Sequence, residues 1–372
     1  MLPDNLGYLF DTPLALTPSK PAVLQGDTVL TFAELDARSN RVANALAALG
    51  VTAGDRVALL FNNDYRFLET LFGAMRLGAV AVPLNIRMGD EALRYVAEDS
   101  EAGVLVASAA LAERGRLLAA QIPAIKHVIA DAPAGDGALA YEDAVAAASP
   151  TLPRRATAFD EVCMQPYTSG STGKPKGVLL THGGQIWNTD IMRKALMADD
   201  TERALIAVPL YHKNAMIGAV KPFLLAGGSL VILPGFDALE VIRAIDRYQV
   251  TYLTGVPAMY KMILAEKDAL GRHDVSSVRF AMCGSAEVPD ELLEEFRRVF
   301  GAPIGESYGL TEGGPVPITN TRWGLKKRGS CGLAFPGCDV RLVDEAGAEV
   351  GVDQVGELIT RNPGLALSLI HI

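Results

Sequence analysis

The chain has 372 residues and a formal net charge of −9, with 49% hydrophobic and 21% charged residues. This length is enough for two or three domains or subdomains with sizeable cores, and the composition is too apolar for a disordered protein. The acidic balance argues against nucleic acid as a partner, because no basic face would attract a phosphate backbone.

The cysteines, the N-terminal residues and the most apolar run indicate the cellular compartment of the protein. The four cysteines contain no C-x-x-C pair and do not cluster with the five histidines, so they form neither a zinc pattern nor a disulfide framework. The start, MLPDNLGYLF, lacks a basic region followed by an apolar core, so we expect no secretory signal. The most apolar run, residues 222–236, is interrupted by proline and paired glycines and is too short to span a bilayer. We therefore expect a cytoplasmic protein without an integral membrane segment.

The first part of the chain alternates strand-like and helix-like segments. Continuous apolar runs predict buried strands, and apolar residues at helical spacing predict the helices between them. In chain order the strands are expected at 56–61, 79–85, 103–108 and 126–130, and the helices at 66–78, at 90–102 and through the 110s. Such strands imply a parallel sheet covered on both faces. Residues 132–153, rich in Ala, Gly and Pro, predict a surface connection.

A second alternating set follows, and then the pattern changes. Its strands are expected at 204–210, 229–234, 250–257 and 277–284, and its helices at 217–225 and 238–248. From about Gly329 onward, and most clearly over 338–360, apolar and polar residues alternate around a Glu-Ala-Gly turn, which predicts antiparallel hairpins. The predicted fold class is α/β, with two parallel-sheet subdomains covered by helices and an incomplete small β-barrel-like subdomain.

The segment YTSGSTGKPKGVLLTH, residues 167–182, has the composition of an anion-binding loop. Backbone N–H groups in a glycine-rich turn can converge on phosphate oxygens, hydroxyls add donors and lysine adds charge. Pro175 stands where the Walker pattern G-x-x-x-x-G-K-[ST] needs glycine, and G-x-G-x-x-G is absent, so neither a P-loop NTPase nor a simple dinucleotide site is expected. Because GVLLTH reads as a strand, the turn itself would hold the anion. A solvated hairpin turn is the alternative.

This loop resembles the signature T-S-G-[ST]-T-G-x-P-K-G of the adenylate-forming superfamily, which comprises acyl-CoA synthetases, luciferases and adenylation domains. Residues 168–177 match it at every position. Other segments match family motifs in the same order: FAELDARSNRVANALAALGVTAGDRVALL from Phe32, PLYH from Pro209, CGSAEVP from Cys283, YGLTE from Tyr308 and KRGSCGLAFPG from Lys327. The resemblance covers essentially the whole chain. It implies an enzyme that joins a carboxylate to the α-phosphate of ATP, releases pyrophosphate and leaves an acyl-adenylate reactive towards a thiol.

The resemblance also implies an ATP site. Lys176 would supply charge, Thr311 would contact the α-phosphate, and Glu312 would hold Mg²⁺, which prefers one or two carboxylates plus phosphate oxygens. The groups expected to cradle the β- and γ-phosphates are Thr168, Ser169, Gly170, Ser171, Thr172 and Gly173. Those expected on the adenine side are Gly284, Ser285, Ala286, Glu287, Glu306, Tyr308 and Gly309. Glu287 and Glu306 have an alternative interpretation as a helix cap near Pro289 or as solvated carboxylates. Lys174 is expected to be solvated.

Two sequence features narrow the range of possible acid substrates. The segment AVPLYHKNAMIGAV has no acidic residue to pair with an ammonium group, which disfavours α-amino acids. Gly309 stands where acetate-specific members carry a tryptophan, which leaves room for a larger acyl group. The candidate pocket residues are His212, Met216, Gly255 and Val256, with a structural histidine and plain core as the alternatives.

Because hydrophobic pockets discriminate by only about 1–3 kcal/mol per methylene, chain length is not readable. A medium or long fatty acid is the first expectation and an aryl acid such as a cinnamate the second. CoA is expected as the acceptor; a carrier-protein thiol, or a non-catalytic nucleotide-binding remnant, is the alternative. No oligomeric state is predicted.

The C-terminal end departs from the family pattern. Family members continue with a ribose-binding aspartate, a hinge and a small domain that carries the adenylation lysine, and we expect these to be absent here. Residues 1–366 would be the large AMP-binding N-terminal domain, with its β subdomain from about 329, and the part alone is not expected to turn over. The last residues, LSLIHI (367–372), fit nothing in the pattern. Because CTG TCT CTT ATA CAC ATC encodes them and resembles a transposase end, we expect an adapter-derived tail.

Overall fold

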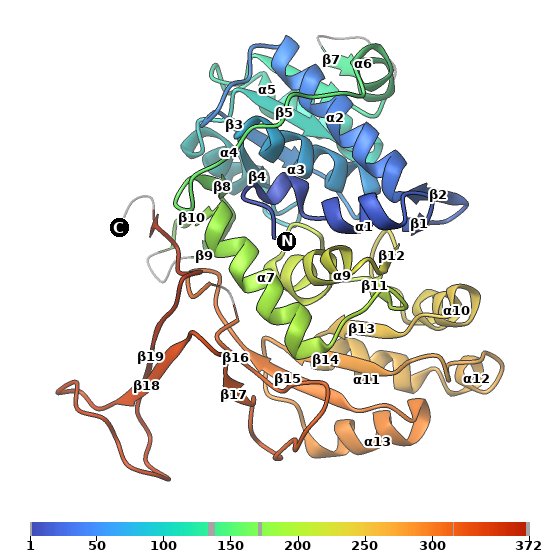
Figure 1. The fold of residues 1–372 in the computed structure, drawn as a ribbon, viewed down its shortest axis with the longest axis vertical. Coiled ribbons are helices and arrows are strands. Elements are labelled where there is room, and N and C mark those ends of the chain that lie inside the picture. The colour runs from blue at the N-terminus through green and yellow to red at the C-terminus, as the bar shows by residue number, and fades with distance from the viewer. Residues whose placement is uncertain (1, 133–137, 170–172, 315, 370–372) are drawn as a thin grey trace.

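The computed structural model describes residues 2–132, 138–169, 173–314 and 316–369. Within these ranges the chain forms two large sheets covered by helices, with a long hairpin that projects from one side (Figure 1). The predicted α/β fold with two parallel-sheet subdomains is confirmed. The C-terminal part is an open two-stranded sheet and no closed barrel. None of the described helices is both long enough and apolar enough to cross a membrane.

The first sheet has the strand order β20-β10-β8-β4-β3-β5-β6-β7, with β9 paired to β10. Its strands are β3 (Arg56–Leu60), β4 (Val80–Pro83), β5 (Val104–Ala107), β6 (His127–Ala130), β7 (Ala138–Ala140), β8 (Val162–Met164), β9 (Tyr167–Ser169), β10 (Pro175–Thr181) and β20 (Ser368–Leu369). Neighbouring strands from β8 to β7 are parallel, whereas β10 runs antiparallel to β8, β9 and β20. The predicted strands form here because their side chains are buried on both faces of the sheet.

Helices on both faces supply the cover that these apolar strands require. They are η1 (Leu6–Tyr8), α1 (Asp11–Leu16), α2 (Phe32–Ala48), α3 (Tyr65–Leu77), α4 (Asp90–Asp99), η2 (Ala109–Leu111), α5 (Ala112–Ala119) and α6 (Tyr141–Ala147). Local sequence fixes their ends. Thr31 and Glu34 form a reciprocal capping box at the start of α2, and Gly78 ends α3 with a φ of 78°, a left-handed conformation that glycine adopts without a steric penalty.

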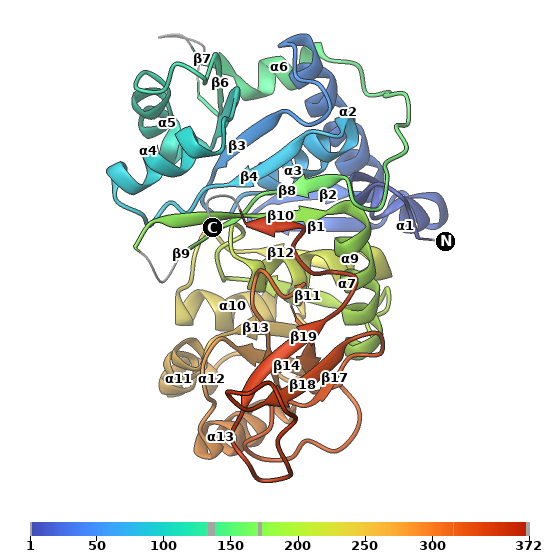
Figure 2. The same ribbon diagram turned by 90° about the vertical axis from the view of Figure 1, so that its left-hand side faces the viewer.

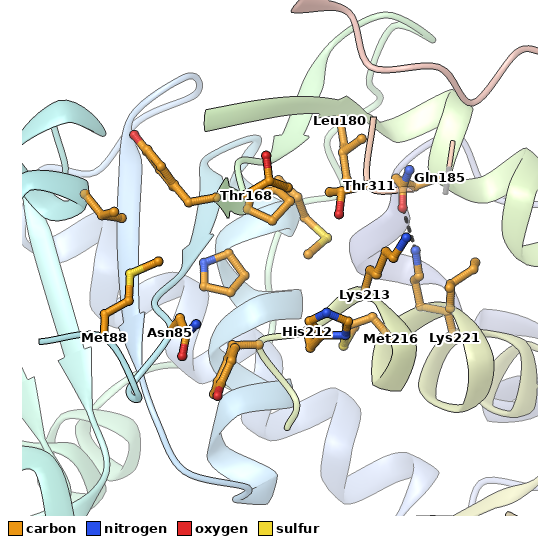
Figure 3. A pocket seen from close by; sticks show the side chains of 17 residues that line it. Asn85, Met88, Thr168, Leu180, Gln185, His212, Lys213, Met216, Lys221 and Thr311 are labelled. Carbon is orange, nitrogen blue, oxygen red and sulfur yellow. Dashed lines mark hydrogen bonds between the residues drawn. The ribbon is translucent and has the colours of Figure 1, made fainter. Parts of the chain in front are cut away.

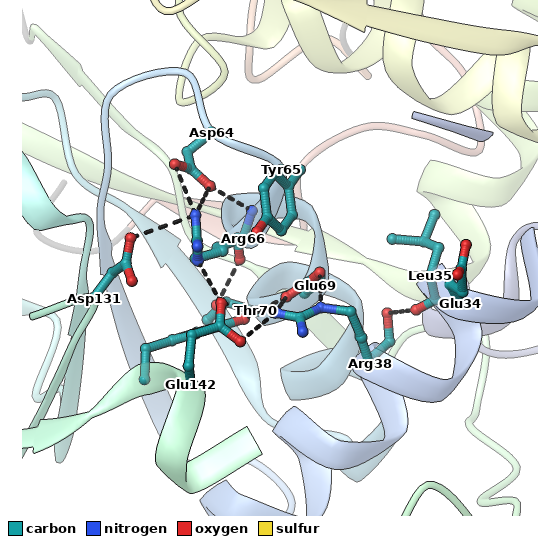
Figure 4. A network of polar contacts seen from close by, with 12 residues as sticks. Glu34, Leu35, Arg38, Asp64, Tyr65, Arg66, Glu69, Thr70, Asp131 and Glu142 are labelled. Carbon is teal, nitrogen blue, oxygen red and sulfur yellow. Dashed lines mark hydrogen bonds and ion pairs between the residues drawn. The ribbon is translucent and has the colours of Figure 1, made fainter. Parts of the chain in front are cut away.

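Residues 132–153 were predicted to be only a surface connection, and this prediction was wrong. The stretch contains β7, which extends the first sheet, and α6. Its alanine residues favour a helix, a preference that the glycine and proline content concealed. The Tyr141 hydroxyl on α6 is buried and donates a hydrogen bond to Glu69 Oε2 on α3 at 2.8 Å. Glu69 also accepts from Arg38 on α2, and Arg38 and Arg66 both contact Glu142 (Figure 4). This polar network ties α6 to the two helices beneath it.

The second sheet has the order β17-β16-β15-β14-β13-β11-β12-β1-β2. Its strands are β1 (Pro21–Gln25), β2 (Thr28–Thr31), β11 (Arg203–Ile206), β12 (Ser229–Ile232), β13 (Tyr252–Gly255), β14 (Phe280–Gly284), β15 (Ile304–Tyr308), β16 (Ile318–Thr319) and β17 (Leu333–Ala334). Pairs from β15 to β1 are parallel, and the strands at both edges are antiparallel. The N-terminal strands β1 and β2 thus join a sheet made mostly by the second half of the chain.

The helices of the second half lie on both sides of this sheet. They are α7 (His182–Leu196), α8 (Lys213–Ala215), the π-helical turn η3 (Met216–Val220), α9 (Lys221–Ala226), α10 (Ala238–Tyr248), α11 (Pro257–Ala265), α12 (Lys267–Leu270) and α13 (Asp290–Phe300). One large hydrophobic cluster contains side chains from α2, α3, α7 and α9 and from both sheets, so the two halves share a core.

The C-terminal residues run back across the molecule. Strands β18 (Asp339–Val343) and β19 (Glu357–Arg361) form the predicted antiparallel hairpin. The chain then returns to the first sheet, where β20 pairs with Val178 and Leu179 of β10 (Figure 2). The proposed boundary at 366 and the adapter origin of the tail stay predictions.

Candidate functional site

Loops that follow the carboxyl ends of parallel strands carry most of the predicted site. Ligands of open α/β sheets bind in the crevice outside these ends. The motif CGSAEVP begins within β14, YGLTE begins at the end of β15, and PLYH follows β11. The parallel register places Gly284 beside Ser307 and Cys283 beside Glu306, so the topology brings the CGSAEVP and YGLTE motifs together.

The expected phosphate loop joins two antiparallel strands. Ser169 of β9 pairs with Pro175 of β10, and Thr168 pairs with Lys176, which is partly buried. The prediction that a strand follows the loop is therefore confirmed. Gly173 has a φ of 92°, in the left-handed region where a Cβ would be strained. The loop residues Gly170, Ser171 and Thr172 lie outside the described residues.

A direct contact connects this loop to the YGLTE motif. The Thr168 hydroxyl donates a hydrogen bond to Glu312 Oε1 at 2.9 Å across 144 positions of sequence. The Glu312 carbonyl in turn accepts a hydrogen bond from the Ala366 N–H at 2.9 Å. A carboxylate therefore lies beside the phosphate loop, and backbone contacts with the returning C-terminal segment hold its position.

Lys213 is part of this site and was missed by the sequence reasoning. Its Nζ donates a hydrogen bond to the Gly309 carbonyl at 2.5 Å. Burial lowers the pKa of Lys213 to about 8, an effect that the nearby Glu312 carboxylate opposes. The available signal was a lysine directly after the histidine of PLYH, in a segment without acidic residues.

Most of the residues predicted for the adenine side line a cavity of about 920 Å³. Those that line it are Ser285, Ala286, Glu287, Glu306, Tyr308 and Gly309, whereas Gly284 lines a smaller cavity. Ser285 has a φ of 69°, which is uncommon for a side chain other than glycine and is a form of strain that concentrates at functional sites. Burial, together with Asp290 and Glu287, raises the pKa of Glu306.

A second cavity has a volume of about 270 Å³ (Figure 3). Of the predicted site residues, those that line it are Thr168, Thr311, His212 and Met216. Its volume is near the lower end of small-molecule sites, which span roughly 300–1,000 Å³. Lys213 and Ile217 line both this cavity and the smaller one beside Gly284.

Two other predicted pocket residues are placed elsewhere. Gly255 ends β13 and Val256 caps α11, and neither lines the cavities described above. His212 has a structural partner as well as a cavity position, because its Nδ1 accepts a hydrogen bond from the Asn214 N–H at 3.2 Å. Burial and the Lys213 charge lower the pKa of His212, which favours the neutral imidazole. Lys174 is exposed as expected, with its Nζ 5.5 Å from the ring centroid of Tyr95.

The carboxylate that the described part of this site offers to a magnesium ion is that of Glu312, beside Thr168. Among the described residues no group of three or more His, Cys, Asp or Glu side chains could hold a metal without other ligands. Glu312 fits a site that is completed by phosphate oxygens, because one of its carboxylate oxygens accepts only from a neutral hydroxyl.

Fold and site together define an α/β protein in which the expected phosphate loop contacts the Glu312 carboxylate beside an internal cavity. Residues 10–369 match the model of the family described as AMP-binding enzyme, and the chain belongs to that family.

Curated relatives agree with this membership. The chain is 39% identical over 352 residues to a feruloyl-CoA synthase of Amycolatopsis sp., covering 94% of this chain and 68% of that protein. It is 33% identical over 375 residues to an indoleacetate–CoA ligase of Aromatoleum aromaticum, covering 97% and 71%. The predicted class of acid–thiol ligase of the acyl-CoA synthetase type is thereby confirmed.

Solved structures show the same fold. An anthranilate CoA ligase, AuaEII, in complex with anthranoyl-AMP superimposes with a TM-score of 0.95 at 27% identity, covering 100% of this chain and 72% of that one. The inhibitor-bound N-terminal domain of FACL13 from Mycobacterium tuberculosis gives a TM-score of 0.90 at 26% identity, covering 99% and 92%.

Proposed function

We propose that this chain binds ATP and an aryl carboxylic acid and joins them as an aryl-AMP, which the thiol of CoA then attacks. In the first step a carboxylate oxygen bonds to the α-phosphorus while the bond to the β-phosphate breaks and pyrophosphate leaves. In the second, the CoA sulfur bonds to the acyl carbon and AMP leaves. The observation that carries the proposal is the hydrogen bond between Thr168 and Glu312, because it joins the two motifs at the mouth of a cavity.

The first step brings a carboxylate against a polyanion, so it depends mainly on charge neutralisation and positioning. We assign the β- and γ-phosphates to the loop that contains Thr168, with Lys176 supplying charge. Thr311, only 9% exposed and at the cavity wall, would contact the α-phosphate. Lys213 adds a second cation between the cavity and Glu312. Mg²⁺ would neutralise phosphate charge, with Glu312 as its protein ligand.

The adenine would occupy the cavity lined by Tyr308 and Glu306. Tyr308 is 42% exposed, which leaves its ring available to stack on a base. Strain at Ser285 and the raised pKa of Glu306 are consistent with a functional site at the ends of β14 and β15.

An aryl acid is preferred over a fatty acid on the strength of the relatives. Their names include feruloyl-CoA synthase, indoleacetate–CoA ligase, 3-hydroxybenzoate–CoA ligase and 4-coumarate–CoA ligase, although a long-chain-fatty-acid–CoA ligase of Bacillus subtilis is also similar at 28% identity. These names also support CoA over a carrier protein as the acceptor. A cytoplasmic location stays a prediction, supported by four cysteines that are free in the structure.

Binding of an adenylate mimic tests this function without requiring turnover. A cinnamoyl sulfamoyl-adenosine resembles the proposed intermediate and should bind at least tenfold tighter than AMP, as calorimetry would measure, because it also fills the acid cavity. Thr311→Val should weaken this binding, whereas Thr321→Val, at an exposed site, should not. Tighter binding of an aminoacyl mimic, or equal binding of AMP and the aryl mimic, would overturn the proposal.

A further inference from the structure

A buried lysine lines the cavity in which the acid is proposed to bind. Lys221, the first residue of α9, is 1% exposed and lines the cavity together with Gln185 of α7, which is equally buried. Lys221 Nζ donates a hydrogen bond to Gln185 Oε1 at 2.6 Å (Figure 3). Both side chains belong to elements that the shared core fixes in place.

This lysine lacks the partners that a buried ammonium group requires. An ammonium carries three donors, and Gln185 Oε1 is the sole acceptor found for them in the described part of the chain. No carboxylate there forms an ion pair with it. The nearby Cys163 is no counter-ion, because burial raises the pKa of its thiol to about 12 and keeps it neutral. Burying an unpaired charge is costly, so such a residue calls for an explanation.

The amide beside the lysine is also incompletely paired. Gln185 Nε2 is buried and has no hydrogen-bond partner, and neither has the side chain of Asn188, one helical turn further along α7. Lys221 and Gln185 thus both line the cavity, and both carry donors without a partner among the described residues. A ligand that brought oxygen acceptors to them would satisfy these donors.

Apolar side chains make up much of the rest of the cavity lining, namely Met164, Leu180, Met216 and Ile217. The matching ligand is therefore largely apolar and carries oxygen acceptors for Lys221 and Gln185. A fatty acid has no oxygen besides the carboxylate that reacts with the α-phosphate, whereas an oxygen-substituted aryl acid has a further one.

We propose that Lys221 and Gln185 form a specificity subsite that selects aryl acids with a hydroxyl or another oxygen substituent on the ring. The inference rests on the proposed function, because it places the acid in this cavity. Burial lowers the pKa of Lys221 to about 8, so the group remains mostly protonated near neutral pH and donates hydrogen bonds to the substituent oxygen. A site built to bind a substrate hydroxyl discriminates strongly against the analogue that lacks it, since its own polar groups are then left unpaired.

The test compares two acids that differ by one hydroxyl group. Binding of 4-hydroxycinnamate and of cinnamate to the chain is measured by calorimetry with saturating AMP. We expect the hydroxylated acid to bind roughly ten- to a hundredfold tighter, as for a hydrogen bond to a charged group. Lys221→Met should bring this ratio close to one. Lys194→Met on the exposed face of α7 removes the same charge away from the cavity and should leave the ratio unchanged.

The outcomes separate this inference from the function on which it rests. Equal binding of the two acids by the wild type, or a ratio that Lys221→Met does not alter, overturns the subsite and leaves the aryl-acid ligase in place. Failure to bind either acid overturns both. The ratio of the two acid affinities in the wild type is measured without any variant. It therefore tests the subsite even if Lys221→Met does not fold. If Lys221→Met binds CoA more weakly but keeps the same ratio between the two acids, Lys221 and Gln185 would belong to the CoA site, and the proposed subsite would be overturned.

Discussion

The Thr168 hydroxyl and the Glu312 carboxylate, 144 positions apart in sequence, are joined by a 2.9 Å hydrogen bond beside the cavity that Thr168 lines. Thr168 lies on β9 in the first half of the molecule, and Glu312 follows β15 in the second. The contact therefore fixes the carboxylate relative to the phosphate loop across the boundary between the two sheets.

Removing this hydrogen bond should weaken nucleotide binding. Thr168→Val keeps the shape of the side chain but loses the donor to a charged acceptor, an interaction of about 1.5–3 kcal/mol. We expect ATP to bind roughly ten- to a hundredfold more weakly, as calorimetry would measure. Thr201→Val is the matched control, because the Thr201 hydroxyl also donates to a carboxylate, that of Asp199, on the exposed surface. Equal losses in both variants would contradict a specific role for Thr168.

Much of the fold was predictable because its strands are apolar on both faces. Segments such as 56–61 and 79–85 could only be buried strands or short buried helices, and their length and flanking residues favoured strands. The helix of α6 was missed because its alanines carry little hydrophobic signal, and its burial depends on Tyr141 reaching Glu69 on another helix.

The site was predictable where the chemistry lies in contiguous motifs, and not where it depends on contacts between distant elements. The residues around Thr168 and Glu312 could be named from local patterns. Lys213 was missed although it directly follows the histidine of PLYH. Lys221 could not be named, because it contacts Gln185 only after α7 and α9 pack together. Gly255 and Val256 were candidate pocket residues, but they end β13 and cap α11 without lining the cavity beside Thr168.

Low pH should destabilise the fold because it favours protonation of His182. This histidine is fully buried, and its Nδ1 accepts a hydrogen bond from the Leu6 N–H at 2.9 Å, which requires the neutral ring. Burial lowers its pKa from 6.5 to about 4. The unfolded state therefore binds more protons below pH 6.5, and the stability held above that pH is lost as pH falls towards 4, by up to about 3 kcal/mol.

His182→Asn provides the test, because its amide oxygen can still accept from Leu6 but does not titrate in this range. Urea unfolding is followed at pH 7.5, 6.0 and 5.0 for both proteins. We expect the wild type to lose more stability than the variant over this interval. Parallel losses would show that other groups control the acid sensitivity.

The polar network beneath α6 should be sensitive to the loss of a single cation. Arg38 contacts Glu69, whose side chain is fully buried and whose pKa is raised by burial. Arg38→Met leaves this carboxylate without its cation, and breaking a buried pair in this way costs about 3 kcal/mol or more. Arg94→Met breaks an exposed pair with Glu98 and should cost about 1 kcal/mol or less. Urea midpoints of the two variants would decide, and similar values would contradict the assignment.

The buried Lys221 ammonium group should lower the free energy of unfolding if its function is to bind a ligand. Its pKa is lowered from 10.5 to about 8, so the ammonium is disfavoured in the folded state, and the full cost is present below pH 8. Lys221→Met removes the buried charge and should raise the free energy of unfolding at pH 7 by about 1–3 kcal/mol, after allowing for Gln185 Oε1, which is left without its donor.

The sign of the pH dependence makes this prediction specific. Between pH 8 and 10.5 the unfolded state of the wild type binds more protons, so wild-type stability rises and the advantage of Lys221→Met should shrink. Thermal unfolding of both proteins at pH 7 and pH 10 measures the difference. A variant less stable than the wild type at pH 7 would mean that the fold itself stabilises the Lys221 ammonium group. The physical reason for a ligand beside Lys221 would then be removed.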